Sequence, residues 1–142
     1  MTGLDCNILV QLAFAEHAAN QKTIAAVQAE TQKGEKLVFP SLVTSEFLHV
    51  ATDARRFDPP LTMVEALNWI EEFLKNPGVG LLEPNLASMD LTLRWMREFS
   101  LGRKRILDTQ LAAILHSHGV GRLLTSNPAD FVVFGVLETI TP

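Results

Sequence analysis

Two carboxylates stand among side chains that the sequence directs toward a protein core. Asp5 lies within residues 3–10, a stretch that is otherwise almost continuously apolar. Glu46 lies three residues after Val43 and one before Phe47, so a helical repeat places it on the same face as these apolar residues. An unpaired carboxylate in a core costs several kcal/mol or takes up a proton. Both acids therefore need a counter-charge.

A third acid, Asp108, has the same relation to its neighbours. Leu111 and Leu115 follow it by three and seven residues, so a helix would turn all three inward. If Leu4 ends a strand of a parallel sheet, Asp5 stands at the carboxyl edge, where ligand and catalytic groups converge. A divalent cation would be a counter-charge common to all three acids. The chain lacks a zinc-type set of Cys and His residues, and oxygen ligands favour Mg²⁺ or Mn²⁺.

Each acid also has an ordinary structural interpretation. Asp108 would be a helix N-cap, and Asp5 would cap the helix that follows it. Glu46 would pair with a buried arginine or lie at the margin of its helix. One metal site accounts for all three positions together, whereas the structural interpretation needs three separate reasons.

A fourth polar group lies near the C-terminus. Asn127, Pro128 and Asp130 fit the N-cap, first and third positions of a short helical turn. The turn follows a predicted strand, so Thr125 and Asp130 would lie beside the same sheet edge as Asp5. Capping alone also explains this pattern.

The elements that must position these residues alternate between strands and helices. This alternation predicts a parallel sheet with helices on both faces. The predicted strands are a short one opening at Leu4 and running into a helix by Val10, then residues 37–39, 79–82, 122–125 and 136–139. The predicted helices cover residues 23–32, a segment with Ser41 as N-cap, a segment behind a Thr62–Glu65 capping box, residues 86–99 and residues 108–118.

The composition narrows the class of protein. A chain of 142 residues, 47% of them hydrophobic, predicts one domain spanning residues 1–142 with a sizeable core. The apolar runs are too short to cross a membrane, and Asp5 interrupts any signal-peptide pattern, so we expect a cytoplasmic protein. The net charge of −4 gives no overall attraction for nucleic acid. Binding to nucleic acid would need a local basic patch or metal ions.

Four short motifs together resemble the PIN-domain ribonucleases, and most closely the VapC-type toxins of toxin–antitoxin pairs. Each motif is weak alone, but the four occur in family order with the expected lengths between them. They are Leu4–Leu9 (LDCNIL), Ser45–Leu48 (SEFL), Ile106–Ala113 (ILDTQLAA), and Leu124–Asn127 (LTSN) followed by Asp130–Phe131.

The resemblance implies a three-layer α/β/α PIN-like fold with a short central parallel sheet. It also implies a Mg²⁺- or Mn²⁺-dependent endoribonuclease that cleaves tRNA or rRNA, forms a homodimer and is inhibited by a VapB-type antitoxin. The resemblance makes Asp5 and Asp108 the principal metal ligands, Glu46 a further acid of the site and Asp130 the fourth acid. Asn7, Thr125 and Asn127 would support them, and the resemblance does not decide whether Asp130 or Asn127 faces the metal.

Cleavage by a carboxylate-bound metal and an activated water would leave a 5′-phosphate and a 3′-hydroxyl. The basic run Arg103, Lys104 and Arg105 just before Asp108 would hold RNA phosphates beside the site. A solvated basic loop is the other interpretation of this run.

Two other classes of function compete with a nuclease. A phosphatase using an aspartyl-phosphate expects Asp-x-Asp after the first strand, where this chain has Asp5-Cys6-Asn7. A receiver-like domain expects a lysine at the end of its last strand, and residues 136–142 contain none. The phosphatase and the receiver-like domain form one competing class, phosphoaspartyl chemistry. The other competing class is a PIN-like module that binds RNA or an antitoxin without catalysis.

Overall fold

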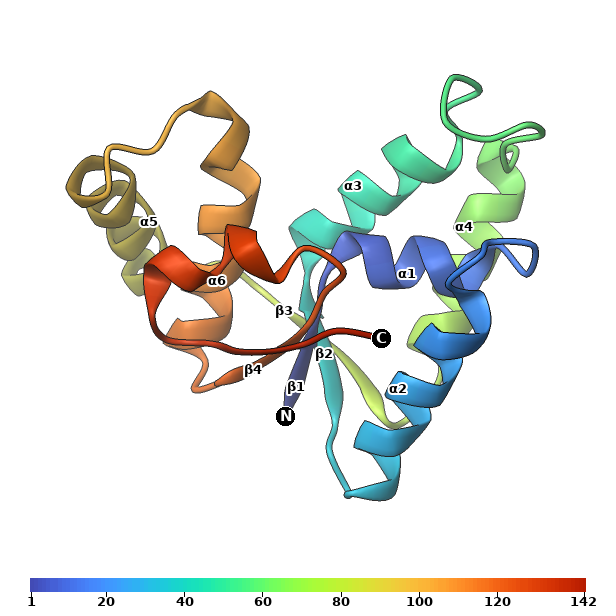
Figure 1. Ribbon diagram of the computed structural model, residues 1–142, viewed down its shortest axis with the longest axis horizontal. Helices are drawn as coiled ribbons and strands as arrows, with labels where there is room; N and C mark the ends of the chain where they lie inside the picture. The colour runs from blue at the N-terminus through green and yellow to red at the C-terminus, as the bar shows by residue number, and fades with distance from the viewer.

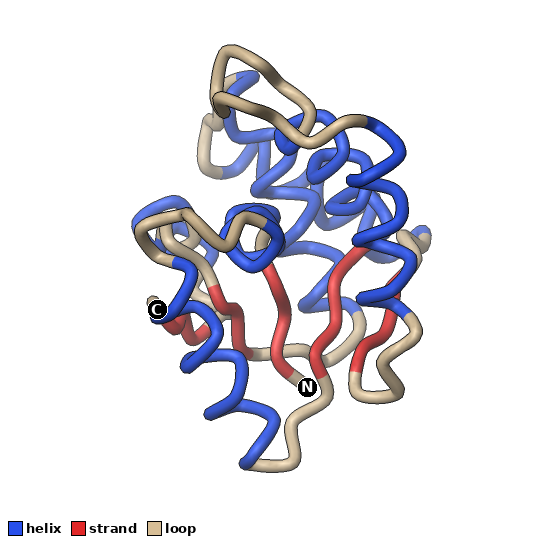
Figure 2. Tube along the Cα trace, turned by 90° about the vertical axis from the view of Figure 1, so that its right-hand side faces the viewer, coloured by secondary structure: helices blue, strands red, loops and turns tan.

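Five short parallel strands form the centre of the protein in the computed structural model, which describes residues 1–142. The strands lie side by side in the order β3-β2-β1-β4-β5 (Figures 1 and 2). Every neighbouring pair is parallel, with Leu4 of β1 opposite Leu124 of β4. The predicted parallel sheet is confirmed. The strands are β1 (Thr2–Leu4), β2 (Leu37–Pro40), β3 (Val79–Leu82), β4 (Arg122–Leu124) and β5 (Glu138–Ile140).

Helices cover both faces of this sheet, as the alternation of elements predicted (Figure 1). The first four lie on one face, and α5 and α6 pack together on the other. These helices are α1 (Cys6–Ala13), α2 (Asn20–Gln32), α3 (Ser41–Ala51), α4 (Met63–Leu74), α5 (Leu86–Glu98) and α6 (Ile106–Ser117). Three short 3-10 turns complete the fold: η1 (Arg103–Arg105), η2 (Pro128–Asp130) and η3 (Val132–Phe134).

The strand order places a crevice above β1 and β4. From β1 the chain passes through α1 and α2 to β2 on one side, whereas β4 lies on the other side and is reached through α5 and α6. Strand order therefore reverses between β1 and β4. In open parallel sheets, ligands bind beyond the carboxyl ends of the strands at such a point.

The core is one cluster of 25 buried hydrophobic residues from both faces of the sheet. Gly3 permits close packing there, because a Cβ at this position would lie 2.7 Å from Leu115 Cδ1 and 3.2 Å from the carbonyl oxygen of Arg122. Helix α6 therefore packs tightly on β1, and this holds Asp108 near the carboxyl end of β1.

Several element boundaries differ from the sequence prediction. The first strand ends at Leu4, because Asp5 accepts a hydrogen bond from the backbone N–H of Cys6 and starts α1 there. Ser41 is the first helical residue and not the N-cap, and its hydroxyl donates to Glu83 at 3.0 Å. The Thr62–Glu65 capping box is confirmed. None of the helices is long and apolar enough to cross a membrane.

Candidate active site

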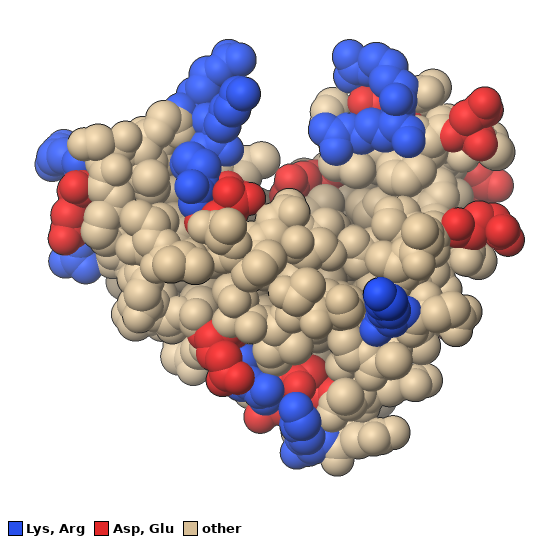
Figure 3. Space-filling view, in the orientation of Figure 1, with Lys and Arg blue, Asp and Glu red and all other residues tan.

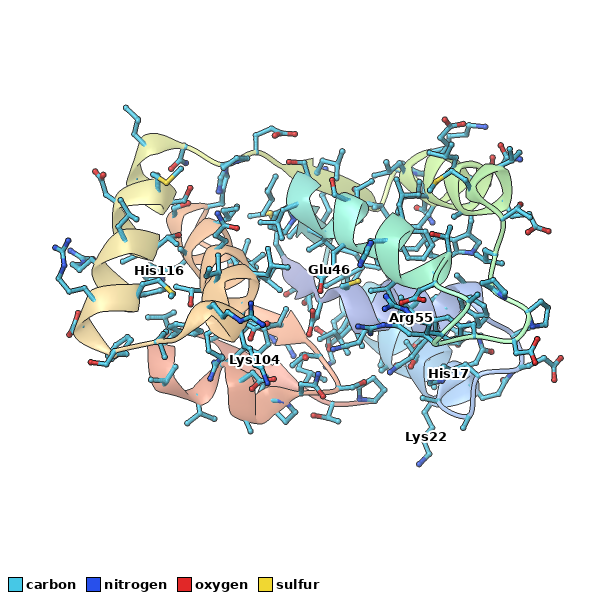
Figure 4. All side chains as sticks on the ribbon, turned by 90° about the horizontal axis from the view of Figure 1, so that it is seen from above. His17, Lys22, Glu46, Arg55, Lys104 and His116 are labelled. Carbon is cyan, nitrogen blue, oxygen red and sulfur yellow. The ribbon has the colours of Figure 1, made fainter.

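A cleft of about 250 Å³ opens above the carboxyl edge of the sheet. Asp5, Glu46 and Asp108 all line this cleft, although 41 and 62 residues separate them along the chain. Asp5 follows β1, Glu46 lies on α3 and Asp108 lies in the first turn of α6. Glu46 is labelled at the centre of Figure 4. The fold thus brings together the three acids that the sequence singled out.

Asp5 is fixed by hydrogen bonds with four groups around it, three donors and one acceptor. Its Oδ1 accepts the N–H of Cys6 at 2.7 Å, and its Oδ2 accepts the Thr125 hydroxyl at 2.6 Å and the Asn7 amide at 2.7 Å. Its own N–H donates to the carbonyl of Leu124 at 3.0 Å. Asp5 therefore caps α1, as the structural interpretation predicted, and its carboxylate is also held in a fixed orientation in the cleft.

The environment of Asp5 opposes its negative charge. Only 8% of the residue is exposed. Burial raises the pKa of Asp5, the charge of Asp108 raises it further, and the hydrogen bonds from Thr125, Cys6 and Asn7 only partly offset these effects. No cation pairs with this carboxylate within the chain.

The negative charge of Glu46 is compensated even less than that of Asp5. Burial raises its pKa to about 7, and the charges of Asp5 and Asp108 contribute in the same direction. Only the charge of Arg56 opposes the shift, and no hydrogen bond does. The alternative in which Glu46 forms a buried ion pair with an arginine is therefore wrong, because no ion pair to Glu46 is formed.

Asp108 differs from the other two acids because a cation contacts it. Arg105 Nε donates to Asp108 Oδ2 at 3.1 Å, while Arg105 also donates to the backbone carbonyl of Asp130. Burial raises the pKa of Asp108, the charge of Asp130 raises it further, and Arg105 counteracts both. Helix α6 begins at Ile106 with Arg105 as N-cap, so the interpretation of Asp108 as the N-cap is wrong.

The turn after β4 separates the roles of Asn127 and Asp130. Asn127 lines the cleft, and its N–H donates to the Thr125 hydroxyl oxygen at 3.0 Å. Asp130 is not among the residues that line the cleft and lies 3.9 Å from Arg105 Nη1. Thr125, which is fully buried, joins this turn to Asp5. Asn127 is the N-cap residue of η2, but its side chain makes no capping hydrogen bond.

The donor set of the cleft fits a hard divalent cation. The charge of Asp108 disfavours ionisation of Asp5, and both charges disfavour ionisation of Glu46, so a cation placed among the three would relieve the repulsion. No three His, Cys, Asp or Glu side chains come close enough together in this arrangement to form a complete ligand set. Metal binding would therefore require the carboxylates to move toward a common point or water to supply further ligands.

Basic side chains flank the cleft on two sides. Arg103 and Lys104 are exposed on η1, and Arg55 and Arg56 are exposed in the turn after α3. Figure 4 labels Lys104 and Arg55 on opposite sides of Glu46, and Figure 3 shows acidic atoms in the hollow between two groups of basic side chains. The pairing of Arg105 with Asp108 places it within the site, whereas Arg103 and Lys104 are free to meet a ligand.

Several cleft residues were missed by sequence analysis. Gln11, His17, Arg56 and Phe57 all line the cleft. Gln11 Nε2 donates to the Ser126 hydroxyl at 2.7 Å, which ties α1 to the turn after β4. Gln11 stands beside apolar residues in α1 and was a detectable signal, whereas the other three lie in irregular segments without periodicity.

No family model matches the chain. A curated relative, ribonuclease VapC33 of Mycobacterium tuberculosis (strain CDC 1551 / Oshkosh), is 27% identical over 142 residues, and the match covers 97% of this chain and 95% of the relative. The structure of VapBC2 from Rickettsia felis bound to a DNA fragment from their promoter has a TM-score of 0.71 and 14% identity, with 99% of this chain and 97% of that chain covered. Over nearly its whole length the chain is thus similar to a VapC-type ribonuclease, and its fold is that of a VapC-type PIN domain.

A further VapC structure has the same fold. VapC20 of Mycobacterium tuberculosis, described as a Sarcin-Ricin loop cleaving toxin, has a TM-score of 0.65 and 12% identity, with 97% of this chain and 98% of that chain covered. The family resemblance inferred from the four motifs is confirmed, as is the PIN-like α/β fold. The three acids of this chain thus lie at the switch point of a PIN-like sheet.

Proposed function

We propose that the protein is a metal-dependent endoribonuclease and the toxin of a VapBC-type toxin–antitoxin pair, and that it cleaves tRNA or rRNA in the cytoplasm. One observation carries the proposal: Asp5, Glu46 and Asp108 line one cleft at the switch point of the sheet without sufficient counter-charge. The relationship to ribonuclease VapC33 supports RNA as the substrate class.

In this proposal Asp5, Glu46 and Asp108 would hold Mg²⁺ or Mn²⁺, with Asn127 or Asp130 completing the set. The ion would supply a Lewis acid for the scissile phosphate and lower the pKa of water. Asn127 is favoured over Asp130 for a direct role, because it lines the cleft. Asp130 acts from outside the cleft, on Asp108 and Arg105.

The remaining polar residues would position these acids. Asn7 and Thr125 both donate to Asp5 Oδ2, and Asn7 also accepts the Ser126 N–H at 3.1 Å. These bonds limit rotation of the Asp5 carboxylate, so its orientation is preorganised before RNA arrives. Arg105 restrains Asp108 in the same way.

The two basic groups beside the cleft would guide RNA to an acidic protein. Lys104 with its neighbour Arg103 on one side and Arg55 with its neighbour Arg56 on the other would contact phosphates that flank the cut (Figure 4). Arg55 is the less available of the second pair, because it forms two hydrogen bonds with Asp53 at 3.0 and 3.1 Å. The contribution of these cations should decline as salt concentration rises.

A cognate VapB-type antitoxin and a second copy of the chain are the proposed protein partners. The structural neighbour from Rickettsia felis is VapBC2, which supports a partner of the first kind. Helix α5 leaves Leu86, Met89 and Leu93 exposed at helical spacing, which supports burial of this face in a homodimer. Sedimentation of wild type and Leu93→Glu tests the dimer, and an unchanged mass for the variant would exclude this face.

The decisive experiment compares cleavage of total RNA by the purified protein in Mg²⁺, Mn²⁺ and EDTA. Asp5→Asn and Asp108→Asn should each reduce the cleavage rate by about 1000-fold, since several kcal/mol of transition-state stabilisation depend on the metal. Asp90→Asn is the matched control, because Asp90 is exposed on α5, away from the cleft. The products should carry 5′-phosphate and 3′-hydroxyl ends.

Two outcomes would contradict this proposal. Equal cleavage by wild type and both site variants would reject the carboxylate site, and 2′,3′-cyclic phosphate products would reject metal-assisted attack by water. Binding of RNA or antitoxin with no cleavage in any metal would favour a non-catalytic PIN-like module.

A further inference from the structure

A second cavity, of about 430 Å³, adjoins the acidic cleft. It lies between the turn joining α1 to α2 and the connection between α3 and α4. His17 and Phe57 line both the cavity and the cleft, so the two spaces are neighbours that share a wall. A ligand with one part at the acids can therefore extend another part into this cavity.

The cavity is walled by flat aromatic and apolar side chains. The rings of Phe14 and Phe57 stack with centroids 4.1 Å apart and an interplanar angle of 15°. Pro60 and Leu61 add further apolar surface. Both phenylalanines are only partly buried, so aromatic surface remains available to a ligand. Unpaired nucleobases stack on such surfaces, with little dependence on base identity.

The polar rim of the cavity offers acceptors that have no partner. Glu16 and Asp58 are exposed on the rim, and neither carboxylate forms a hydrogen bond or ion pair. Glu65 is occupied, since its carboxylate accepts the N–H and hydroxyl of Thr62 at 2.7 and 2.8 Å. Free carboxylates recognise exocyclic amino groups, which cytosine, adenine and guanine carry and uracil lacks.

The segment that forms this cavity also carries a cation for the phosphate backbone. Arg56 lines the acidic cleft, and the next residue, Phe57, lines both spaces. The acid nearest to the Arg56 guanidinium is Asp53, with Arg56 Nε 3.8 Å from Asp53 Oδ2. Arg56 therefore keeps donors free for a phosphate, while its neighbour Phe57 lines the second cavity.

Resting on the proposed function, we propose that this cavity binds one nucleobase of the RNA, on a nucleotide adjacent to the cleaved phosphodiester, and selects a base with an exocyclic amino group. A peptide segment is the less suitable occupant. The free acids of the rim would attract a basic peptide, but Arg56, which lines the adjoining cleft, would repel it and attract RNA phosphates.

Binding of mononucleotides tests the cavity without any cleavage. Amide chemical shifts of the protein in EDTA are followed while CMP or UMP is added. We expect CMP to shift the amides of residues 14–17, 57, 58 and 61 and to bind about tenfold more tightly than UMP. Asp58→Asn should reduce this preference to less than about threefold, and Phe57→Leu should weaken both nucleotides about tenfold because the stacking surface is lost.

Asp90→Asn serves as the matched control and should keep the CMP preference, because Asp90 lies on α5. The amide spectrum itself reports whether each variant is folded. Shifts confined to other residues, equal binding of CMP and UMP, or unchanged preference in folded Asp58→Asn would each overturn the proposal. Binding of a basic peptide in the cavity with no nucleotide binding would also overturn it.

Mapping of cleavage positions separates this proposal from the proposed function. On RNA of random sequence the wild type should disfavour uracil at one position beside the cut, and Asp58→Asn should lose that bias. Cleavage that depends on Asp5 but shows no bias would overturn the base site alone. Failure of the Asp5 and metal tests would overturn the nuclease, while the mononucleotide titration would still decide whether the cavity binds a base.

Discussion

The two ends of strand β1 carry buried carboxylates in opposite electrostatic situations. At the amino end, the Thr2 hydroxyl donates to Glu30 at 2.8 Å, and Glu30 is 1% exposed. Arg122 and Lys33 both pair with Glu30 at 2.7 Å. At the carboxyl end, Asp5 is almost as deeply buried but has only uncharged hydrogen-bond donors.

The pKa values reflect this difference. Burial alone would raise the pKa of Glu30, but the hydrogen bonds of Lys33 and Thr2 and the charges of Arg122 and Lys33 outweigh it and lower the pKa. The pKa values of Asp5, Glu46 and Asp108 are all raised. The charge of Glu30 is compensated by cations built into the chain, whereas uncompensated acids in a cleft indicate a site for an added cation.

Removing the built-in cation at the amino end should have the largest effect on stability. In Arg122→Met, Glu30 would lose one of its two ion pairs while it stays buried, and Glu35 and Glu138 would also lose their contacts with Arg122. The free energy of unfolding should therefore fall by about 3 kcal/mol. Urea denaturation measures this change. Arg94→Met is the matched control, because Arg94 is exposed on α5 and forms no ion pair.

The double variant Arg122→Met with Glu30→Gln should recover part of this loss, because the buried and now less compensated charge of Glu30 is removed as well. If Arg122→Met and Arg94→Met had equal stability, the pairing of Arg122 with Glu30 would contribute nothing to stability. The proposed contrast between the two ends of β1 would then be wrong.

The two ends were not equally predictable from sequence. Asp5 was found because it interrupts an apolar strand, and Glu46 and Asp108 because they share helical spacing with core residues. Glu30 gave no such signal, since α2 has few buried residues and its partner Arg122 lies 92 positions away. Sequence patterns detect acids that interrupt an apolar face, but they do not detect ion pairs between distant elements.

The irregular segments set a second limit on prediction. Arg56 and Phe57 lie between α3 and α4, where no repeat indicates which way a side chain points. The basic run was singled out as a unit, yet Arg105 turns to Asp108 while Arg103 and Lys104 stay exposed. Likewise, only the path of the turn after β4 distinguishes Asn127, which lines the cleft, from Asp130, which does not.

Added metal should stabilise the protein only through the acids at the carboxyl end of β1. At a Mn²⁺ concentration about 100 times its dissociation constant, the free energy of unfolding should rise by about 2.7 kcal/mol relative to EDTA. Asp5→Asn and Asp108→Asn should lose most of this gain, and Glu138→Gln should keep it, because Glu138 pairs with Arg122 at the other end. Thermal denaturation in each buffer measures the gain. An equal gain in all four proteins would mean that the metal binds elsewhere.

Neutralising Glu46 should raise the free energy of unfolding, whereas Arg122→Met should lower it. In metal-free protein at pH 8 the Glu46 carboxylate is charged and uncompensated, so Glu46→Gln should raise the free energy of unfolding by about 1–2 kcal/mol while it reduces metal affinity. Glu72→Gln is the control, since Glu72 is exposed on α4 and pairs only with Lys75. Destabilisation by Glu46→Gln in EDTA would show that the charge of Glu46 is compensated after all.

The difference in the free energy of unfolding between wild type and Glu46→Gln should itself depend on pH, and this is the smallest of the expected effects. The pKa of Glu46 is about 7 in the folded protein and near its ordinary value of 4.5 in the unfolded chain. Between these values the folded state binds more protons at this residue, so its contribution to stability is fully present below about pH 4.5 and is lost as the pH rises through 7. In EDTA the wild type should therefore lose about 1 kcal/mol of stability relative to Glu46→Gln between pH 5 and pH 7.5.

Glu30, whose pKa is lowered, contributes in the other direction, and its stabilisation is lost only as the pH falls below 4.5. Urea midpoints at closely spaced pH values measure both trends. A constant difference between wild type and Glu46→Gln across this range would mean that Glu46 titrates like an exposed acid, and its place among the uncompensated carboxylates would be lost.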